Sequence, residues 1–272
     1  MGDTLSFAIT HTTTYSFDQP VKYALQQLRM FPRNGHGQRV VDWKTTVTGG
    51  QKQVAFDDQF MNRTELVRLD AGAIRIEIIS EGVVEVEDRN GVIGKHSGYT
   101  PLWLYTEATP MTAAGNTVRK MAGQIRADCT EMDDIARMHE LATRVSEAVK
   151  YETGHTDAET TAEMALTAGH GVCQDQAHVM IAVARQLGYP ARYVSGYLFM
   201  DGQVNQDASH AWCEVWTESL GWIGFDVANQ ICPDARYVRV AAGRDYGDAA
   251  PIQGVRHGAG GEQLQVSLQV QQ

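Results

Sequence analysis

The 272-residue sequence lacks any stretch close to the roughly 18 consecutive apolar residues that a membrane-spanning helix needs. Its opening segment, MGDTLSFAIT, lacks the basic and apolar regions of a secretory signal peptide. Cysteine is scarce, and no C-x-x-C pair occurs among Cys129, Cys173, Cys213 and Cys232. Four dispersed cysteines do not make a disulfide framework. We therefore expect free thiols, a cytoplasmic location and no association with a membrane.

Basic runs are also missing. The chain carries 23 Lys and Arg residues against 33 Asp and Glu residues, a formal net charge of −10. An acidic chain without a basic cluster is unsuited to binding the phosphate backbone, so we expect no nucleic-acid partner. Hydrophobic residues make up 43% of the chain and charged residues 21%, the balance of a globular protein with a buried core. Composition leaves the oligomeric state open.

The first 98 residues show the two-residue period of half-buried strands. The alternating apolar residues are Phe7, Ile9, Ile74, Ile76 and Ile78. Gly49-Gly50 and Asn90-Gly91 are turn signals, and no long helical pattern interrupts the segment. The pattern predicts an all-β N-terminal domain over residues 1–98.

From residue 99 onward the pattern changes. One helix is predicted after a capping box at Thr130-x-x-Asp133, and its apolar face is formed by Ile135, Met138, Ala142, Val145 and Val149. A second amphipathic helix is predicted over 172–187, with Gly188 as its stop signal. Three strand-like segments follow, ARYVSGYL, HAWCEVWT and GWIGFDVA, and an alternating tail over 264–270 predicts a late strand. The order predicts an α+β fold, with residues 99–272 forming a core that ends in a strand tail.

Cys173 lies in the segment GHGVCQDQAHVM, at the predicted start of the second helix. It begins an inward stripe that continues with Ala177, Met180, Ala184 and Leu187. The free N–H groups and the dipole of a helix N-terminus favour a thiolate, which is the nucleophilic form of cysteine. This position predicts a reactive thiol rather than an inert buried one.

Two histidines compete for the role of base. At about 100° per residue, His178 lies about 140° around the helix from Cys173 and is badly placed. His210 opens a predicted strand on which Trp212 shares its face, and Asp226 ends the next strand. A cysteine, a histidine and a carboxylate on three neighbouring elements form a nucleophile, a base and a residue that orients the base. Direct pairing of 210 with 226 requires a bulge or an asymmetric loop in the hairpin.

Several blocks of the sequence then resemble a known family. The blocks GVCQDQAHVM, LGYPARYVSGYL, SHAWCEVW, GWIGFDVAN and GRDYGDAAPIQG resemble the transglutaminase-like superfamily, in its bacterial branch of candidate cysteine proteases. The blocks HTTTYSFDQPV, LRMFPR and FDDQFMNR resemble the bacterial transglutaminase-like N-terminal domain. The resemblance implies a papain-like core and a Cys–His–Asp triad at Cys173, His210 and Asp226. The family usually has Pro-Thr-Asn after the aspartate, where this chain has Val-Ala-Asn at 227–229.

Residues around the triad are candidates for shaping the site or the substrate pocket. Asp175 belongs to the family motif, His178 lies on the same helix, and Trp212 is a candidate for the wall of the cleft. The backbone N–H of Cys173 is the natural first donor of an oxyanion hole, and Tyr151 is a candidate for the second. Calcium is not expected, because no EF-hand-like loop is present.

Three interpretations of Cys173 remain. A zinc site could use His170, Cys173, His178 and His210, but structural zinc motifs show two tight ligand pairs and this chain has at most one. A peptide-binding module that retains the triad is the non-enzymatic alternative. We favour a cofactor-free thiol enzyme that acts on a protein or peptide amide, by hydrolysis, deamidation or transglutamination. The triad alone does not separate these three reactions.

Overall fold

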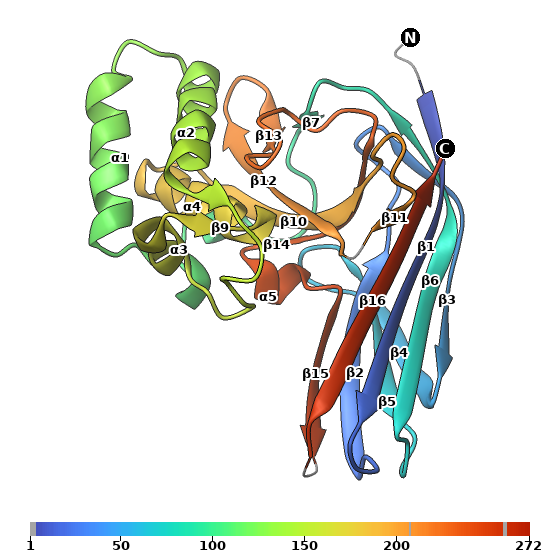
Figure 1. The fold of residues 1–272 in the computed structure, drawn as a ribbon. Coiled ribbons are helices and arrows are strands. Elements are labelled where there is room, and N and C mark those ends of the chain that lie inside the picture. The colour runs from blue at the N-terminus through green and yellow to red at the C-terminus, as the bar shows by residue number, and fades with distance from the viewer. Residues whose placement is uncertain (1–3, 207, 258–259) are drawn as a thin grey trace.

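A computed structural model describes residues 4–206, 208–257 and 260–272 (Figure 1). The N-terminal half contributes seven strands: β1 (Thr4–Phe17), β2 (Tyr23–Phe31), β3 (Gln38–Thr48), β4 (Gly50–Asp57), β5 (Arg63–Leu69), β6 (Arg75–Glu87) and β7 (Val92–Gly94). Two short 3₁₀ turns, η1 (Leu102–Tyr105) and η2 (Pro110–Thr112), lead into the helices.

The second half begins with helices and short strands: α1 (Asn116–Asp128), α2 (Asp134–Ala148), β8 (Lys150–Tyr151), α3 (Ala162–Ala168), β9 (His170–Gly171) and α4 (Cys173–Gln186). Strands then dominate: β10 (Ala191–Leu198), β11 (Asn205–Gln206), β12 (His210–Thr217), β13 (Gly221–Phe225) and β14 (Tyr237–Gly243). The chain ends with α5 (Tyr246–Ala249), β15 (Ile252–His257) and β16 (Glu262–Gln271). This order confirms the α+β fold with a β-rich N-terminal half.

The alternating pattern of the N-terminal half folds into two facing sheets. One sheet has the strand order β11-β16-β1-β6-β3 and the other β15-β2-β5-β4. Ile76 and Ile78 of β6 point inward, fully buried, in a core shared with β2 and β5. Ile74 is the exception to the prediction: it precedes β6, is 62% exposed, and lies in the turn rather than on the strand.

The C-terminal strands return to these N-terminal sheets. The predicted tail strand forms as β16 and pairs antiparallel with β1 along its whole length, while β15 pairs with β2. In the other direction, β7 leaves the N-terminal half and pairs with β13. The predicted domain boundary at residue 98 stays a prediction. Strands from each side of this boundary pair with strands of the other half.

The second half is built around a five-stranded sheet with the order β14-β10-β12-β13-β7. Helix α4 packs on β10 and β12, and α1, α2 and α3 pack on the outer side of α4. The sequence predicts an amphipathic helix here, but α4 is buried nearly all round: Val179, Ile181 and Val183 are as buried as the inward Met180. A helix placed between a sheet and three other helices has no solvent face to keep polar.

The predicted capping box before α2 is wrong by one turn. The N-cap is Asp133, whose side chain accepts a hydrogen bond from the backbone N–H of Ala136. The hydroxyl of Thr130 instead donates to the carbonyls of Arg126 and Ala127, at the end of α1. Asp133 is itself a preferred capping residue, so it needs no help from Thr130.

The two halves meet through a second buried cluster. Phe7 and Ile9 of β1 and Leu268 of β16 pack against Tyr197 of β10 and Val238 of β14. In Figure 1 the long strands extend beyond this junction as a separate lobe, away from the helices. Among the described residues, no helix combines the length and the apolar character required to cross a bilayer.

Candidate active site

Two short strands position the start of α4. Helix α3 ends at Gly169, which adopts a left-handed conformation with φ of 78°. The chain then passes through β9, which pairs in parallel with β8, so that Gly171 lies beside Tyr151. Val172 is extended, and Cys173 is the first residue of the helix. The N–H groups of the first helical turn have no carbonyl partner within the helix, which makes this end suited to a thiolate or an oxyanion.

Asp175 fixes that helix start from within. Its carboxylate oxygen Oδ2 accepts hydrogen bonds from the backbone N–H of Val172 and from the hydroxyl of Thr156, both at 2.8 Å. Burial raises the pKa of Asp175, although these donors act in the opposite direction. A Cβ at Gly171 would lie 2.7 Å from the Cβ of Asp175, so only glycine fits there without movement. Asp175 therefore shapes the site by holding the backbone on either side of Cys173.

His210 and Asp226 lie at the ends of adjacent strands. The ring atom Nε2 of His210 lies 2.6 Å from Oδ2 of Asp226. The ladder between β12 and β13 runs without interruption from Cys213↔Phe225 to Thr217↔Gly221. Continued by one position, this register places Asp226 opposite Trp212, so His210 reaches its partner diagonally. The two residues are not directly paired, so the bulge or asymmetric loop that direct pairing requires is absent, and the long imidazole side chain spans the diagonal instead.

The structure also brings His210 to Cys173. Both side chains line the same cleft, the charge of Cys173 contributes to raising the pKa of His210, and the bond of Nε2 to Asp226 leaves Nδ1 to face the thiol. Burial on its own lowers the pKa of His210, but the interactions with Asp226 and Cys173 outweigh it and raise the pKa to about 10. The imidazole therefore carries a proton at neutral pH. A protonated imidazole beside the sulfur stabilises a thiolate.

Two residues that the sequence analysis did not single out support Asp226. Besides His210, its Oδ2 accepts hydrogen bonds from the side-chain amide of Asn229 at 2.7 Å and from the hydroxyl of Tyr237 at 2.6 Å. Burial raises the pKa of Asp226, but the bonds from His210, Tyr237 and Asn229 lower it further than burial raises it. The carboxylate thus stays ionised although its residue is only 1% exposed. Asn229 was visible as the last residue of the Val-Ala-Asn segment, but nothing local in the sequence points to Tyr237.

Trp212 lies beneath the histidine. Its ring is buried and stacks on that of His210, with centroids 6.2 Å apart, and meets Tyr237 edge to face at 5.5 Å. Trp212 does not line the cleft that contains Cys173. It supports His210 from below, and its role in shaping the site stays a prediction.

His178 occupies a different environment from His210. It is fully buried, its Nε2 accepts a hydrogen bond from the backbone N–H of Tyr246 at 3.0 Å, and its ring lies against Tyr193. Burial, with the charge of Arg185 as a smaller cause, lowers the pKa of His178 to about 3. A neutral imidazole engaged with the backbone holds the start of α5 in place. It contributes to the site only through Tyr246, which lines the cleft.

The other three cysteines lie in surroundings that do not favour a thiolate. Cys129 and Cys213 are fully buried, and burial raises the pKa of Cys213 well above its ordinary value. Burial also raises the pKa of Cys232. All four thiols are free. Of these thiols, that of Cys173 has the imidazole partner and the helix N-terminus.

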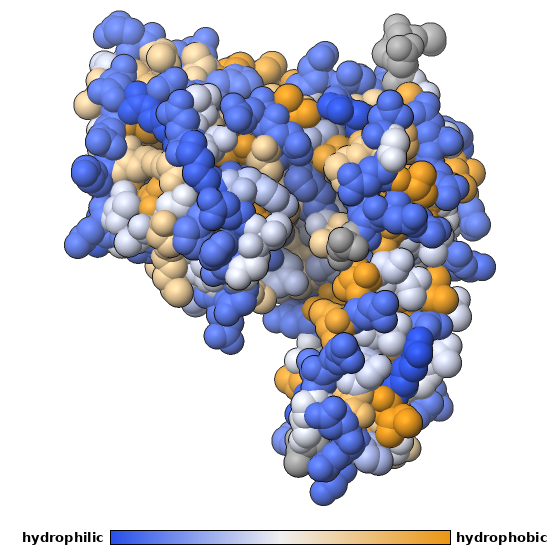
Figure 2. Space-filling model, in the orientation of Figure 1, coloured by the Kyte–Doolittle hydropathy of each residue, from blue (hydrophilic) through white to orange (hydrophobic). Residues whose placement is uncertain are grey.

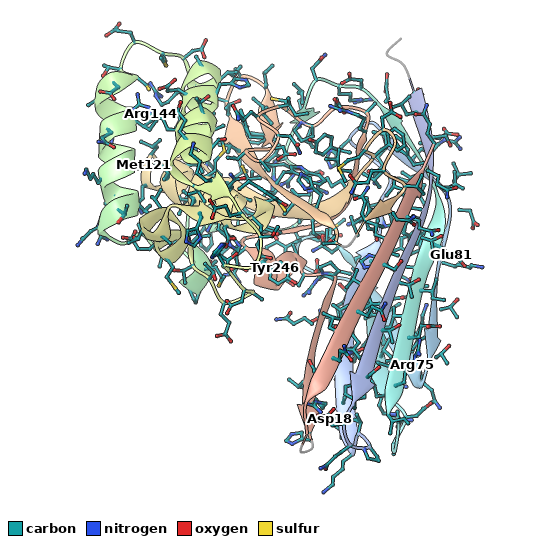
Figure 3. The ribbon with its side chains drawn as sticks, in the orientation of Figure 1. Asp18, Arg75, Glu81, Met121, Arg144 and Tyr246 are labelled. Carbon is teal, nitrogen blue, oxygen red and sulfur yellow. The ribbon has the colours of Figure 1, made fainter. Side chains whose placement is uncertain are left out.

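Cys173 and His210 line a cleft of about 720 Å³ between the two halves of the molecule. Its far wall belongs to the N-terminal sheet, through Thr13 of β1 and Leu264 and Val266 of β16. Figure 2 shows the surface hollowed at this junction, and Figure 3 places Tyr246 there, between the helices and the long strands.

Tyr151 lies on the rim of the same cleft. Its side chain is 55% exposed, and burial, with the charges of Cys173 and Asp226 as smaller causes, raises its pKa. A protonated phenol beside the thiol is a hydrogen-bond donor, as a second oxyanion donor must be.

The residues of the zinc alternative do not converge. His178 turns toward Tyr246 rather than toward Cys173. Within residues 4–206, 208–257 and 260–272, no three His, Cys, Asp or Glu side chains gather closely enough to hold a metal ion. The absence of a cofactor stays a prediction.

Comparison with known proteins identifies the family. Residues 119–227 match the transglutaminase-like superfamily, and residues 7–85 match the bacterial transglutaminase-like N-terminal region. The chain belongs to the transglutaminase-like superfamily. The superfamily segment contains Cys173, His210 and Asp226, and the bacterial segment supplies β1, one of the two strands that face them across the cleft.

Individual proteins resemble this chain over different shares of its length. An uncharacterized protein of Mycobacterium leprae is 28% identical over 96% of this chain and 97% of its own, and one of Mycobacterium tuberculosis is 27% identical over 94% and 88%. A protein-glutamine gamma-glutamyltransferase of Pseudomonas aeruginosa is 36% identical over 73 residues, which are 24% of this chain and 11% of that protein. The crystal structure of a candidate cysteine protease from Cytophaga hutchinsonii has the same fold, with a TM-score of 0.79 and 20% identity over 99% of this chain and 91% of that one.

Proposed function

We propose that the protein is a thiol-dependent acyl-transfer enzyme that acts on amide bonds of proteins or peptides through Cys173, His210 and Asp226. The observation that carries the proposal is the position of His210 between the thiol of Cys173 and the carboxylate of Asp226. This is the arrangement of nucleophile, base and orienting acid that acyl transfer requires.

In the proposed reaction the thiolate of Cys173 attacks the amide carbonyl carbon and forms a carbon–sulfur bond. The negative charge that develops on the carbonyl oxygen is stabilised by the N–H of Cys173, with the phenol of Tyr151 as the proposed second donor. The carbon–nitrogen bond then breaks, and protonated His210 donates its proton to the departing amine. A thioester remains on Cys173, and His210 is neutral.

The second half of the reaction releases the acyl group. Neutral His210 takes a proton from an incoming water or amine, which attacks the thioester and returns the sulfur to its thiolate form. Water yields a carboxylic acid, which is peptide hydrolysis or deamidation, and an amine yields a new amide, which is transglutamination. The likeness to a candidate cysteine protease and to a protein-glutamine gamma-glutamyltransferase supports acyl transfer in general. A cytoplasmic location belongs to the same proposal, because a reducing compartment keeps Cys173 as a thiol.

A mass-spectrometric assay tests this function. The protein is incubated with a peptide library, with and without added cadaverine, in the presence of EDTA. We expect a thioester adduct on the peptide that carries Cys173, absent from Cys173→Ala, and product peptides that carry either a new carboxylate or cadaverine. Failure to acylate Cys173 with any library member, while chloroacetamide still alkylates it, would point to the non-enzymatic peptide-binding module.

A further inference from the structure

The wall of the cleft opposite Cys173 includes an open sheet edge. Strand β16 pairs with β1 from Gln271 to Glu262, but β11 covers its other side only at Leu268 and Gln269. Among the described residues, no strand pairs with the outer side of β16 between Glu262 and Ser267. This edge lies at the front of the molecule in Figure 1, beside the junction of the two halves.

The register shows which groups of β16 face outward. The backbone N–H of Val270 donates to the carbonyl of Val204, next to β11, so Val270 directs its main-chain groups away from β1. Main-chain direction and side-chain face both alternate with a period of two along an antiparallel strand. Leu264 and Val266 therefore direct their N–H and C=O groups to the open edge. The same two residues direct their side chains into the cleft that contains Cys173.

This edge lacks the usual protection against pairing. Natural proteins protect edge strands with charged residues, proline or a bulge, because an open edge pairs with other chains. After Glu262 the segment QLQVSLQVQQ contains no charged residue and no proline, and its pairing with β1 shows no bulge. Leu264 is 53% exposed, and Figure 2 shows hydrophobic residues gathered on the strand lobe beside the hollow.

The chain itself already occupies the neighbouring positions of this edge. Strand β11 pairs with β16 and ends at Gln206, and the catalytic candidate His210 begins β12 only four residues later. The edge of β16 therefore continues, past β11, along the wall of the cleft that His210 and Cys173 also line.

We propose that an extended segment of the polypeptide substrate pairs as an added strand with β16, through the main-chain groups of Leu264 and Val266. The inference rests on the proposed function, because it identifies how the amide reaches Cys173. Main-chain hydrogen bonds supply affinity in this mode of recognition, and pockets for alternate side chains supply specificity. The substrate class is thus an unfolded or extended polypeptide, and not a helix or a free amino acid amide.

Two alkylating probes test the proposal. One is the peptide chloromethyl ketone acetyl-Thr-Val-Thr-Val-Gly-CH₂Cl, and the other is acetyl-Gly-CH₂Cl, which carries the same reactive group but no extended backbone to pair. The measured quantity is the ratio of their rates of alkylation at Cys173, determined by mass spectrometry. We expect a ratio of at least about 10 in the wild-type protein, because one or two added hydrogen bonds contribute roughly 1.4 kcal/mol or more. Methylation of the backbone nitrogens of the peptide probe, one at a time, should abolish this ratio at alternate positions only.

Variants locate the edge. Val266→Pro removes the outward N–H and leaves the pairing with β1, since proline is tolerated on an edge strand where its nitrogen faces outward. We expect this variant to lose most of the ratio. Val266→Ala truncates the same side chain but keeps the outward N–H, so it is the matched control for Val266→Pro and should keep most of the ratio.

The outcomes separate the two proposals. A ratio near 1 in the wild-type protein, or a ratio unchanged by Val266→Pro and by every N-methylation, overturns the strand-addition proposal while leaving Cys173 reactive. No alkylation of Cys173 by acetyl-Gly-CH₂Cl overturns the proposed function, and the substrate proposal with it.

Discussion

The carboxylate oxygen Oδ2 of Asp226 lies 2.6 Å from Nε2 of His210, although the two residues are not opposite each other in the hairpin. The same oxygen also accepts hydrogen bonds from Asn229 and Tyr237. Three donors on one oxygen fix the carboxylate, and the carboxylate fixes the imidazole with its other nitrogen toward Cys173. The orientation of His210 therefore depends on groups from three segments of the chain.

Replacement of Asp226 should reduce activity without abolishing it. In the wild type, the backbone N–H of Asn229 donates to Oδ1 of Asp226. Asp226→Asn keeps one oxygen to accept from His210, but its amide nitrogen takes the place of Oδ1 and faces this N–H without an acceptor. We expect the rate of acyl-enzyme formation to fall by roughly 10- to 1,000-fold, equal to about 1.4 to 4 kcal/mol. Asp226→Ala should be slower still. The double variant with His210→Ala should be no slower than His210→Ala alone, because members of one catalytic unit are not additive.

Tyr237 tests the support of the carboxylate. Tyr237→Phe removes one donor from Asp226, and a hydrogen bond to a charged group contributes about 1.5 to 3 kcal/mol. We expect acyl-enzyme formation to slow by about tenfold or more. Tyr197→Phe is a matched control, since it removes an equally buried hydroxyl that contacts His11 instead. Equal rates for the two variants would show that Tyr237 only fills space.

Local sequence patterns predict which segments form helices and strands better than they predict which of these elements pair or pack together. The alternating segment at the C-terminus predicts a strand, and β16 forms, but no local signal says that it pairs with β1 at the other end of the chain. The predicted amphipathic face of α4 includes Ala177 and Met180, yet the helix is buried on its other sides by α1, α2 and α3. Ile74 continues the alternation in the sequence but lies beyond the strand. Such outcomes depend on tertiary packing, which a local period does not contain.

The site shows the same division. The position of Cys173 at a helix start follows from the sequence alone, and helical geometry alone places His178 away from the thiol. The pairing of His210 with Asp226 followed from family resemblance as much as from the residues, since the register argument pointed to a bulge that is not there. Tyr237 was missed because it reaches Asp226 from β14, the far edge of the core sheet, and only the tertiary fold brings the two together.

Gly171, two residues before Cys173, should be essential to the start of α4. Gly171→Ala places a Cβ 2.7 Å from Asp175, and overpacking of this kind costs about 1 to 3 kcal/mol of the free energy of unfolding. Alkylation of Cys173 should also slow. Gly123→Ala in α1 meets no atom within 4 Å and should stabilise the protein by up to about 1 kcal/mol. Urea unfolding measures both variants, and equal stabilities would refute the tight contact.

The buried His178 should make the protein less stable in acid. Its pKa is about 3 in the folded protein and about 6.5 when unfolded, so below pH 6.5 only the unfolded state binds the proton. Stability is therefore lost as the pH falls from 6.5 toward 3, by up to about 1.4 kcal/mol per pH unit. His178→Gln keeps an acceptor for the N–H of Tyr246 and removes this titration. Between pH 6.5 and 5, the free energy of unfolding of the wild type should fall by about 1 to 2 kcal/mol more than that of His178→Gln, as measured by urea unfolding. Parallel curves for the two proteins would contradict the buried neutral histidine.

The most direct test of the account is the rate at which iodoacetamide alkylates Cys173 at pH 6 to 7 in the wild type, His210→Ala and His178→Gln. We predict that Cys173 is labelled before Cys129, Cys213 and Cys232 in the wild type, because an imidazolium at His210 stabilises its thiolate. His210→Ala should slow the labelling by at least about tenfold, and His178→Gln should leave it close to the wild-type rate. Labelling of His210→Ala at the wild-type rate, together with slow labelling of His178→Gln, would show that the base is the histidine on α4 and that the proposed triad is wrong.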